Sequence, residues 1–218
     1  MTDPYMPALN TFLFSEDDIK AIELALAKDM PWDWKPKGAV ARDIKSVKDK
    51  IRAFHMLRHN HRCCYCRRDL KDGGHFMVDR EHILPKSFEA YRHLTFCMWN
   101  LSVSCKRCNM EYKKNKDDFV VVKDDPGRFE ESGNYFIIHP NFDKYKDHIS
   151  KSSIEYDDIV VVKFTKKAGS AKGAFTYDYF NLAGMEREMA NDAQGVMIVA
   201  DPSEAGLQVR RLAEEANQ

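Results

Sequence analysis

Residues 63–66 read CCYC and residues 105–108 read CKRC, and these two stretches decide the fold of the chain. In each, two cysteines are separated by two residues, the spacing at which two thiolates on one tight turn share a tetrahedral zinc ion. Two such pairs close the site with four thiolates, so the predicted zinc is structural and its binding contributes to folding. The predicted zinc ligands are Cys63, Cys66, Cys105 and Cys108. The other two cysteines, Cys64 and Cys97, are interpreted as small core residues or free thiols.

The sequence before the first cysteine pair predicts two helices. Ser15 is followed by three acidic residues, which is typical of an N-cap and an acidic first turn. Proline and glycine at residues 31–38 end this first helix and indicate a linker. A second helix is expected over residues 41–61, with one apolar face made of Ile44, Val47, Ile51, Phe54 and Leu57.

The sequence from the first cysteine pair onward predicts short strands as well as helices. Residues 75–83 indicate a strand that passes into a loop ending at Pro85, and residues 100–116 a short strand, the second cysteine pair and a helix. Thirty-eight residues separate the cysteine pairs, more than a simple zinc ribbon needs, so we expect a functional element between them. Beyond Phe119 the expected strands are 135–140, 158–165 and 176–182, and the expected helices 185–193 and 204–215.

The composition is that of a globular protein, with 44% hydrophobic and 31% charged residues in a chain of 218. No apolar run approaches the roughly 20 residues that span a bilayer, and the N-terminus has no secretory pattern, so we expect a cytoplasmic protein without membrane contact. The net charge is zero, but residues 41–72 hold ten Lys and Arg against four Asp and Glu. Residues 185–218 hold three Lys and Arg against seven Asp and Glu, so the chain has a basic middle and an acidic end.

Three motifs carry a resemblance to a known family: VDREHILPKS at residues 78–87, WNL at 99–101 and CKRCNMEYK at 105–113. In this order, framed by two cysteine pairs, they resemble the HNH endonuclease family in its four-cysteine form, over about residues 63–118. The resemblance implies an α+β fold with a ββα-metal core. N-terminal helices and a mixed α/β C-terminal extension would flank this core.

The resemblance also assigns roles to residues between and after the cysteine pairs. His82 corresponds to the general base that takes a proton from water. Glu81 and Asn109 correspond to the ligands of a catalytic divalent ion, Mg²⁺ or Mn²⁺, and the family more often has Asp at the Glu81 position. Adjacent residues of an extended strand point opposite ways, so Glu81 and His82 share one site only if the chain bends there. Asn100 corresponds to a residue that braces the loop holding the base.

Further residues complete the predicted site. Asp79, three residues before His82, is expected to accept a hydrogen bond from its imidazole and to set its tautomer. Lys86, Arg107 and Lys113 are expected to bind phosphate groups. The family resemblance implies hydrolysis of phosphodiester bonds that leaves 5′-phosphate and 3′-hydroxyl ends, in DNA rather than RNA. It also suggests a role in bacterial defence beside a protein partner such as an ATPase.

The predicted organisation has three parts. Residues 1–40 form a helical segment, residues 41–120 the nuclease core with its zinc site, and residues 121–218 an extension with a partner-docking role. A second interpretation belongs to another class: a zinc-stabilised module that binds nucleic acid or protein and does not cut. That module needs the cysteine pairs but has no need of the acid–His pair or of Asn109, so their presence favours the enzyme.

Overall fold

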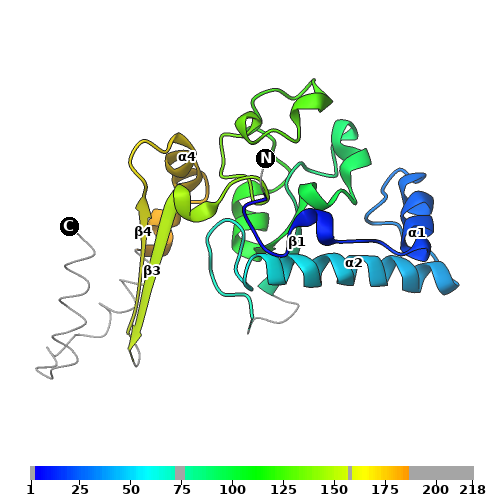
Figure 1. Ribbon diagram of the computed structural model, residues 1–218, viewed down its shortest axis with the longest axis horizontal. Helices are drawn as coiled ribbons and strands as arrows, with labels where there is room; N and C mark the ends of the chain where they lie inside the picture. The colour runs from blue at the N-terminus through cyan, green and yellow to red at the C-terminus, as the bar shows by residue number, and fades with distance from the viewer. Residues whose placement is uncertain (1–2, 72–76, 157–158, 187–218) are drawn as a thin grey trace, which may run out of the picture.

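The structure, a computed structural model, describes residues 3–71, 77–156 and 159–186 of the chain. It has an α+β architecture in which two N-terminal helices precede two small antiparallel sheets (Figure 1). The predicted α+β class and the two N-terminal helices are therefore confirmed. Among the described residues, no helix combines the length and the apolar character needed to cross a bilayer.

Helix α1 (Glu16–Leu26) begins where the sequence predicts. The Ser15 side chain accepts a hydrogen bond from the backbone N–H of Asp18 at 3.3 Å, and the Asp18 carboxylate accepts one from the Ser15 backbone N–H at 3.0 Å. This reciprocal capping box satisfies two backbone donors that the first turn leaves unpaired. Ala21 and Ala25 are the buried small residues through which α1 packs against α2.

Helix α2 (Gly38–Arg58) is the long helix along the bottom of Figure 1. Its buried positions are Ile44, Val47 and Ile51, followed by His55 and Arg58. The prediction of Phe54 and Leu57 on this face is wrong, because Leu57 is 61% exposed and Phe54 only partly buried. A straight helix turns 100° per residue, so the buried stripe continues from Ile51 to positions four and seven residues later.

The first sheet consists of β1 (Val78–His82) and β2 (Leu101–Cys105). The strands run antiparallel, with Val78 opposite Cys105 and His82 opposite Leu101. β2 leads directly into η4 (Arg107–Lys113), a short helix of the π type. Leu101 packs in one hydrophobic cluster with Val47 and Ile51, so α2 supports β2 from below.

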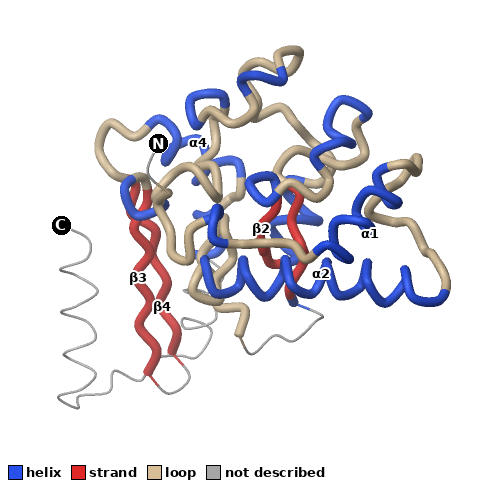
Figure 2. The backbone as a smooth tube through the Cα atoms, turned by 45° about the vertical axis from the view of Figure 1, so that its right-hand side comes forward, coloured by secondary structure: helices blue, strands red, loops and turns tan. Residues whose placement is uncertain are grey.

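The second sheet is a hairpin of β3 (Ile149–Tyr156) and β4 (Ile159–Lys166). It is followed by α4 (Ala171–Tyr179), whose first turn is capped by the Ser170 side chain accepting from the Gly173 backbone N–H. Figure 2 shows this hairpin away from β2, at the other end of the molecule from α1. The remaining short helices are η1 (Leu9–Thr11), η2 (Glu89–Leu94), η3 (Met98–Asn100), η5 (Pro126–Arg128), η6 (Ser132–Asn134) and η7 (Tyr145–Asp147).

The structure corrects several expected elements beyond residue 119. The strand at 158–165 is confirmed as β4, but the strand at 135–140 is reduced to a single bridge between Tyr135 and Val120. There the Ile138 backbone N–H donates a hydrogen bond to the Thr176 hydroxyl at 2.7 Å, and not to the backbone of a neighbouring strand. The expectation of a strand at 176–182 is wrong, because residues 176–179 belong to α4. The helices expected at 185–193 and 204–215 lie outside the described residues, apart from positions 185 and 186.

One large hydrophobic cluster joins the cysteine region to the second half of the described chain. It contains the four cysteines of the predicted zinc site together with Phe129, Tyr135, Phe164 and Phe180. The Phe180 ring stacks on Tyr65 at a centroid distance of 4.2 Å. The segment before residue 120 and the segment after it therefore share one core.

Candidate functional site

The first cysteine pair lies in the turn that follows α2. The Cys63 backbone N–H donates to the Arg68 carbonyl at 2.9 Å, and the Arg67 N–H donates to the Cys63 carbonyl at 3.0 Å. These bonds close a tight turn in which Arg67 has a positive φ of 56°. A further bond from the Cys64 N–H to the Val103 carbonyl, at 3.0 Å, fixes this turn beside β2.

The second pair lies where β2 gives way to η4, and all four predicted ligands converge. Their sulfur atoms lie within 4.8 Å of one another, and the Sγ atoms of Cys66 and Cys105 are 3.7 Å apart. Four sulfurs at about 2.3 Å from a tetrahedral zinc ion are about 3.8 Å apart, so the cluster fits such an ion. All four side chains are buried, which agrees with a closed structural site and supports the prediction from the spacing.

His82 ends β1 in a buried environment on the side of α2. Its ring makes an edge contact with Trp32 at a centroid distance of 4.5 Å, and its Nε2 lies 3.1 Å from the Thr95 carbonyl oxygen. A carbonyl only accepts, so the hydrogen is on Nε2 and the lone pair of the neutral ring is on Nδ1. Burial, together with the charges of Lys86 and Lys113, lowers the pKa of His82 to about 3. The imidazole is therefore held neutral at physiological pH.

Asn100 ties together the loop that follows His82. Its side-chain oxygen accepts from the Leu84 backbone N–H at 2.7 Å, and its amide nitrogen donates to the carbonyls of Leu84 and Leu94. The Asn100 carbonyl also accepts from the Ile83 N–H at 2.9 Å. Thr95 comes directly after Leu94, so this network fixes the carbonyl that orients His82. The geometry is that of a brace, with both functions of a fully buried amide satisfied by backbone.

Glu81 faces the opposite side of β1 from His82. The strand stays in register through both residues, with Glu81 opposite Ser102 and His82 opposite Leu101, so the chain does not bend between them. The Glu81 carboxylate is completely buried and is 2.9 Å from the Lys113 ammonium. It also accepts hydrogen bonds from the Tyr65 and Ser104 hydroxyls, at 3.1 and 3.3 Å. Burial raises the pKa of Glu81, while Lys113 and these two donors oppose that shift.

Asp79 and Asn109 form a second polar group on the Glu81 face. The Asn109 amide nitrogen donates to Asp79 at 3.1 Å, and the Lys106 ammonium lies 3.1 Å from the same carboxylate. This corrects the expectation for Asp79, because the His82 imidazole is oriented by the Thr95 carbonyl instead. Residues 79 and 82 lie on opposite faces of a regular strand, which explains the difference.

The expected divalent-ion ligands, Glu81 and Asn109, are engaged in these two separate groups. Both Glu81 oxygens accept hydrogen bonds or pair with an ammonium, and Asn109 turns its amide nitrogen to Asp79. Mg²⁺ needs an octahedron of oxygens at about 2.0–2.1 Å, usually including several waters. A fully buried carboxylate already matched by a lysine does not offer that arrangement. As placed, these side chains do not fit a catalytic Mg²⁺ or Mn²⁺ ion.

The three residues expected to bind phosphate have different settings. Lys86 is partly exposed and pairs with Asp33. Arg107 donates to the carbonyls of Phe180 and Asn181 and lies over the Tyr112 ring, so it joins η4 to the end of α4. Lys113 is 3% exposed in its side chain and pairs with Glu81. Lys113 therefore serves the interior, whereas Arg107 is half-buried and its guanidinium is bonded to backbone carbonyls just after α4.

Sequence reasoning missed several residues around His82. Thr95 contacts His82 through its backbone carbonyl, which every residue type has, so the sequence could not indicate this contact. Trp32 was interpreted as part of a linker, yet it contacts His82, and the Lys48 ammonium lies 5.0 Å from the Trp32 ring centroid. Two tryptophans within four residues, at positions 32 and 34, were the available signal, because a plain linker rarely carries such large apolar side chains.

Comparison of the chain with models of protein families, with curated proteins and with solved structures finds no match.

Replacing Cys66 or Cys108 by serine is expected to release the zinc ion, because a neutral hydroxyl is a poor substitute for a thiolate ligand. The measurement is zinc per chain by plasma mass spectrometry after dialysis, with about one ion expected for the unchanged chain. The matched control is Cys97→Ser, which changes a half-buried cysteine outside the cluster. Full retention of zinc by Cys108→Ser would contradict the four-thiolate site.

Acid is expected to destabilise the fold through its buried neutral histidines. Burial lowers the pKa of His55, as it does that of His82, to about 3. The unfolded chain, with histidine pKa values of about 6.5, therefore binds more protons below that pH. The contribution of these histidines to the free energy of unfolding is complete above about pH 6.5 and is lost as the pH falls from there towards 3. Between pH 7.5 and 5.5, each such histidine should cost about 1.4 kcal/mol of unfolding free energy.

Urea unfolding of His55→Leu at these two pH values tests this linkage. The variant should lose less stability between pH 7.5 and 5.5 than the unchanged chain does, by about the contribution of one histidine. The control His93→Leu, at an exposed position of η2, should behave like the unchanged chain. An equal loss in all three proteins would show that His55 is not held neutral.

Proposed function

We propose that the protein is an endonuclease of the HNH type that hydrolyses phosphodiester bonds in DNA, with His82 as the general base. The observation that carries the proposal is the hydrogen bond from His82 Nε2 to the Thr95 carbonyl, which leaves the Nδ1 lone pair to accept a proton from water. Asn100 secures that carbonyl by bracing the loop before it. The order of β1, β2 and η4 supports the proposal as well, because the HNH resemblance implies two strands followed by a helix, with a four-cysteine cluster beside them.

Electrostatics at His82 suit an anionic substrate. Phosphodiester hydrolysis needs an activated water and positive charge near the phosphate. Lys48 and Lys86 act on His82 with their positive charge, as does Lys113, which is itself buried against Glu81. A phosphate group bound there would bring negative charge, which raises the pKa of a nearby histidine towards the range useful for a base.

By the HNH resemblance the proposed activity would use a divalent ion, Mg²⁺ or Mn²⁺, which would supply positive charge near the phosphate. The Glu81–Lys113 pair speaks against binding of that ion in the present arrangement. The defence role, and an ATPase as partner, rest on the resemblance alone.

The same ion pair favours a second candidate function, a zinc-stabilised module that binds nucleic acid or protein without cutting it. In such a module Lys113 would permanently neutralise Glu81. The two candidates differ in one property, cleavage that depends on His82.

Replacing His82 by alanine is expected to abolish nicking of supercoiled plasmid, because general-base catalysis typically contributes a factor of about 10²–10⁴. The assay is run with Mg²⁺, with Mn²⁺ and with EDTA, and zinc content and thermal unfolding are recorded for each protein. The matched control is His93→Ala, which removes an exposed histidine in η2 and should nick normally. Nicking by His82→Ala at the rate of the unchanged chain would refute the mechanism, and no nicking by any protein would favour the binding module.

A further inference from the structure

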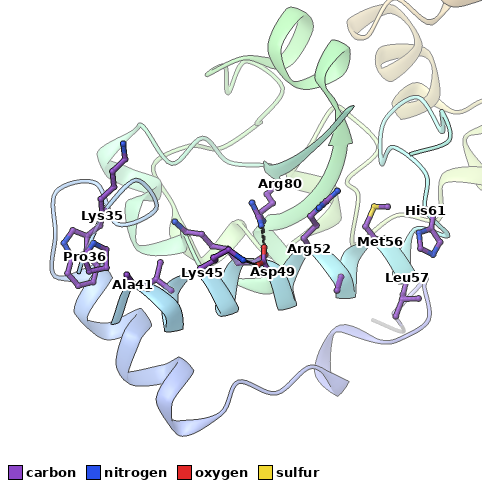
Figure 3. A pocket seen from close by; sticks show the side chains of 14 residues that line it. Lys35, Pro36, Ala41, Lys45, Asp49, Arg52, Met56, Leu57, His61 and Arg80 are labelled. Carbon is purple, nitrogen blue, oxygen red and sulfur yellow. Dashed lines mark hydrogen bonds and ion pairs between the residues drawn. The ribbon is translucent and has the colours of Figure 1, made fainter. Parts of the chain in front are cut away.

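A groove of about 1050 Å³ runs along the exposed side of α2. Figure 3 shows its lining side chains in a row, from Lys35 and Pro36 at one end of the helix to Leu57 and His61 at the other, with Arg80 of β1 above them. We call it the α2 groove. Its charged lining residues are Lys35, Lys45, Lys48, Arg52, Arg80 and Asp49.

The α2 groove has an excess of positive charge in a chain whose net charge is zero. Asp49 is the one carboxylate among its lining residues, and it pairs with both Lys45 at 2.8 Å and Arg80 at 2.5 Å. One anion is thus shared by two cations, and three further cations line the same surface, of which Lys48 donates to the Trp32 carbonyl at 2.6 Å. Lys35 and Lys45 are exposed at its rim. Such a row of cations is complementary to a polyanion.

Apart from His61, the rest of the lining is apolar. Trp34, Ile44, Met56 and Leu57 lie among the cations, and Leu57 is the most exposed of them. A duplex presents phosphates outward and keeps its bases stacked inside, so it would leave this apolar surface without a partner. An unpaired strand presents both phosphates and the faces of its bases, which bind to cations and to aromatic or apolar side chains respectively.

His82 is buried and does not line the groove, but two of the lining residues, Arg80 and Lys48, connect the groove to the surroundings of that histidine. Arg80 lies two residues before His82 on β1, so the two side chains share a face of the strand. Lys48 connects them from below: its ammonium lies over the Trp32 ring at 5.0 Å, and that ring contacts His82. From Lys45 to Leu57 the helix rises about 18 Å, the length of about five stacked nucleotides.

We propose that the α2 groove binds an unpaired strand of nucleic acid and guides its backbone to His82, the cations holding phosphates and the apolar side chains holding sugars and bases. The inference rests on the proposed nuclease function, since the bound strand is the substrate of that site. It places phosphate binding on the surface of α2 and not at Arg107, which is bonded to two backbone carbonyls, or at Lys113, which is buried against Glu81.

Binding is measured by fluorescence anisotropy with a labelled 12-nucleotide DNA strand and the full zinc-loaded chain carrying His82→Ala, so that the strand stays intact. In that background, the double variant Lys35→Glu/Lys45→Glu should raise the Kd at least about tenfold, through the loss of two phosphate contacts. The slope of log K against log salt should fall by about 1.4, the value for two contacts with a single strand. Both lysines are exposed, so the fold should tolerate the change.

The matched control is Lys20→Glu/Lys167→Glu, which changes the net charge equally at exposed positions outside the groove. The control should leave the Kd within about twofold, because distant charges are screened at physiological salt. Equal weakening by both double variants would overturn the inference, as would preference for a 12-base-pair duplex. Displacement of the strand by poly-glutamate at equal charge concentration would also overturn it, because the groove would then be an acidic-peptide site.

The outcome for the groove is separable from that for the nuclease. Strand binding that depends on Lys35 and Lys45, without any plasmid nicking, would support strand binding in the α2 groove and contradict the proposed nuclease activity. Nicking that depends on His82 but is unaffected by Lys35→Glu/Lys45→Glu would contradict strand binding in the α2 groove and support the proposed nuclease activity.

Discussion

Convergence of four thiol groups at one point is the constraint on which the rest of the structure depends. The first sheet has only two strands of five residues each, and a sheet of that size is marginal without further support. The cysteine cluster joins the turn after α2, the end of β2 and the start of η4, three segments that differ in direction. A zinc ion bound there would contribute its binding free energy to folding and would set the position of β2, against which β1 aligns.

Alignment of β1 divides the polar residues into two groups with different chemistry. On one face, Glu81 and Asp79 are matched by Lys113, by hydroxyls and by Asn109, which makes a satisfied polar interior. On the other face, His82 is fixed through a carbonyl, beside Trp32 and near lysines. The alternation of a regular strand thus places the candidate base away from the candidate metal ligands. The α2 groove lies on the His82 side, where Arg80 is also found.

The sequence predicted those parts of the molecule whose physical cause is local. Cysteine spacing predicted the cluster, the Ser15 cap predicted the start of α1, and apolar runs predicted β4. The bracing geometry of Asn100 was expected from the HNH resemblance, and its bonds to Leu84 and Leu94 are those of a brace.

Other features depend on contacts between distant residues and escaped prediction. β3 is polar in sequence and is a strand because β4 pairs with its whole length. The pairing of Lys113 with Glu81 joins η4 to β1, so nothing near Lys113 distinguishes it from a surface lysine. The contacts of Arg107 could not be predicted either, because its partners Phe180 and Asn181 lie over seventy residues away in the sequence. The Thr95 carbonyl acts through the backbone, which every residue possesses.

The central claim is that the four-thiolate site, through the strands it aligns, holds the His82 imidazole neutral with its hydrogen on Nε2. Long-range proton–nitrogen NMR of the His82 ring, recorded from pH 5 to 8 with zinc bound and after zinc removal, tests it most directly. The account predicts one neutral form with the hydrogen on Nε2 throughout this range when zinc is bound. After zinc removal it predicts ordinary titration near pH 6.5. A His82 ring that carries its hydrogen on Nδ1 with zinc bound, or that behaves identically with and without zinc, would contradict the account.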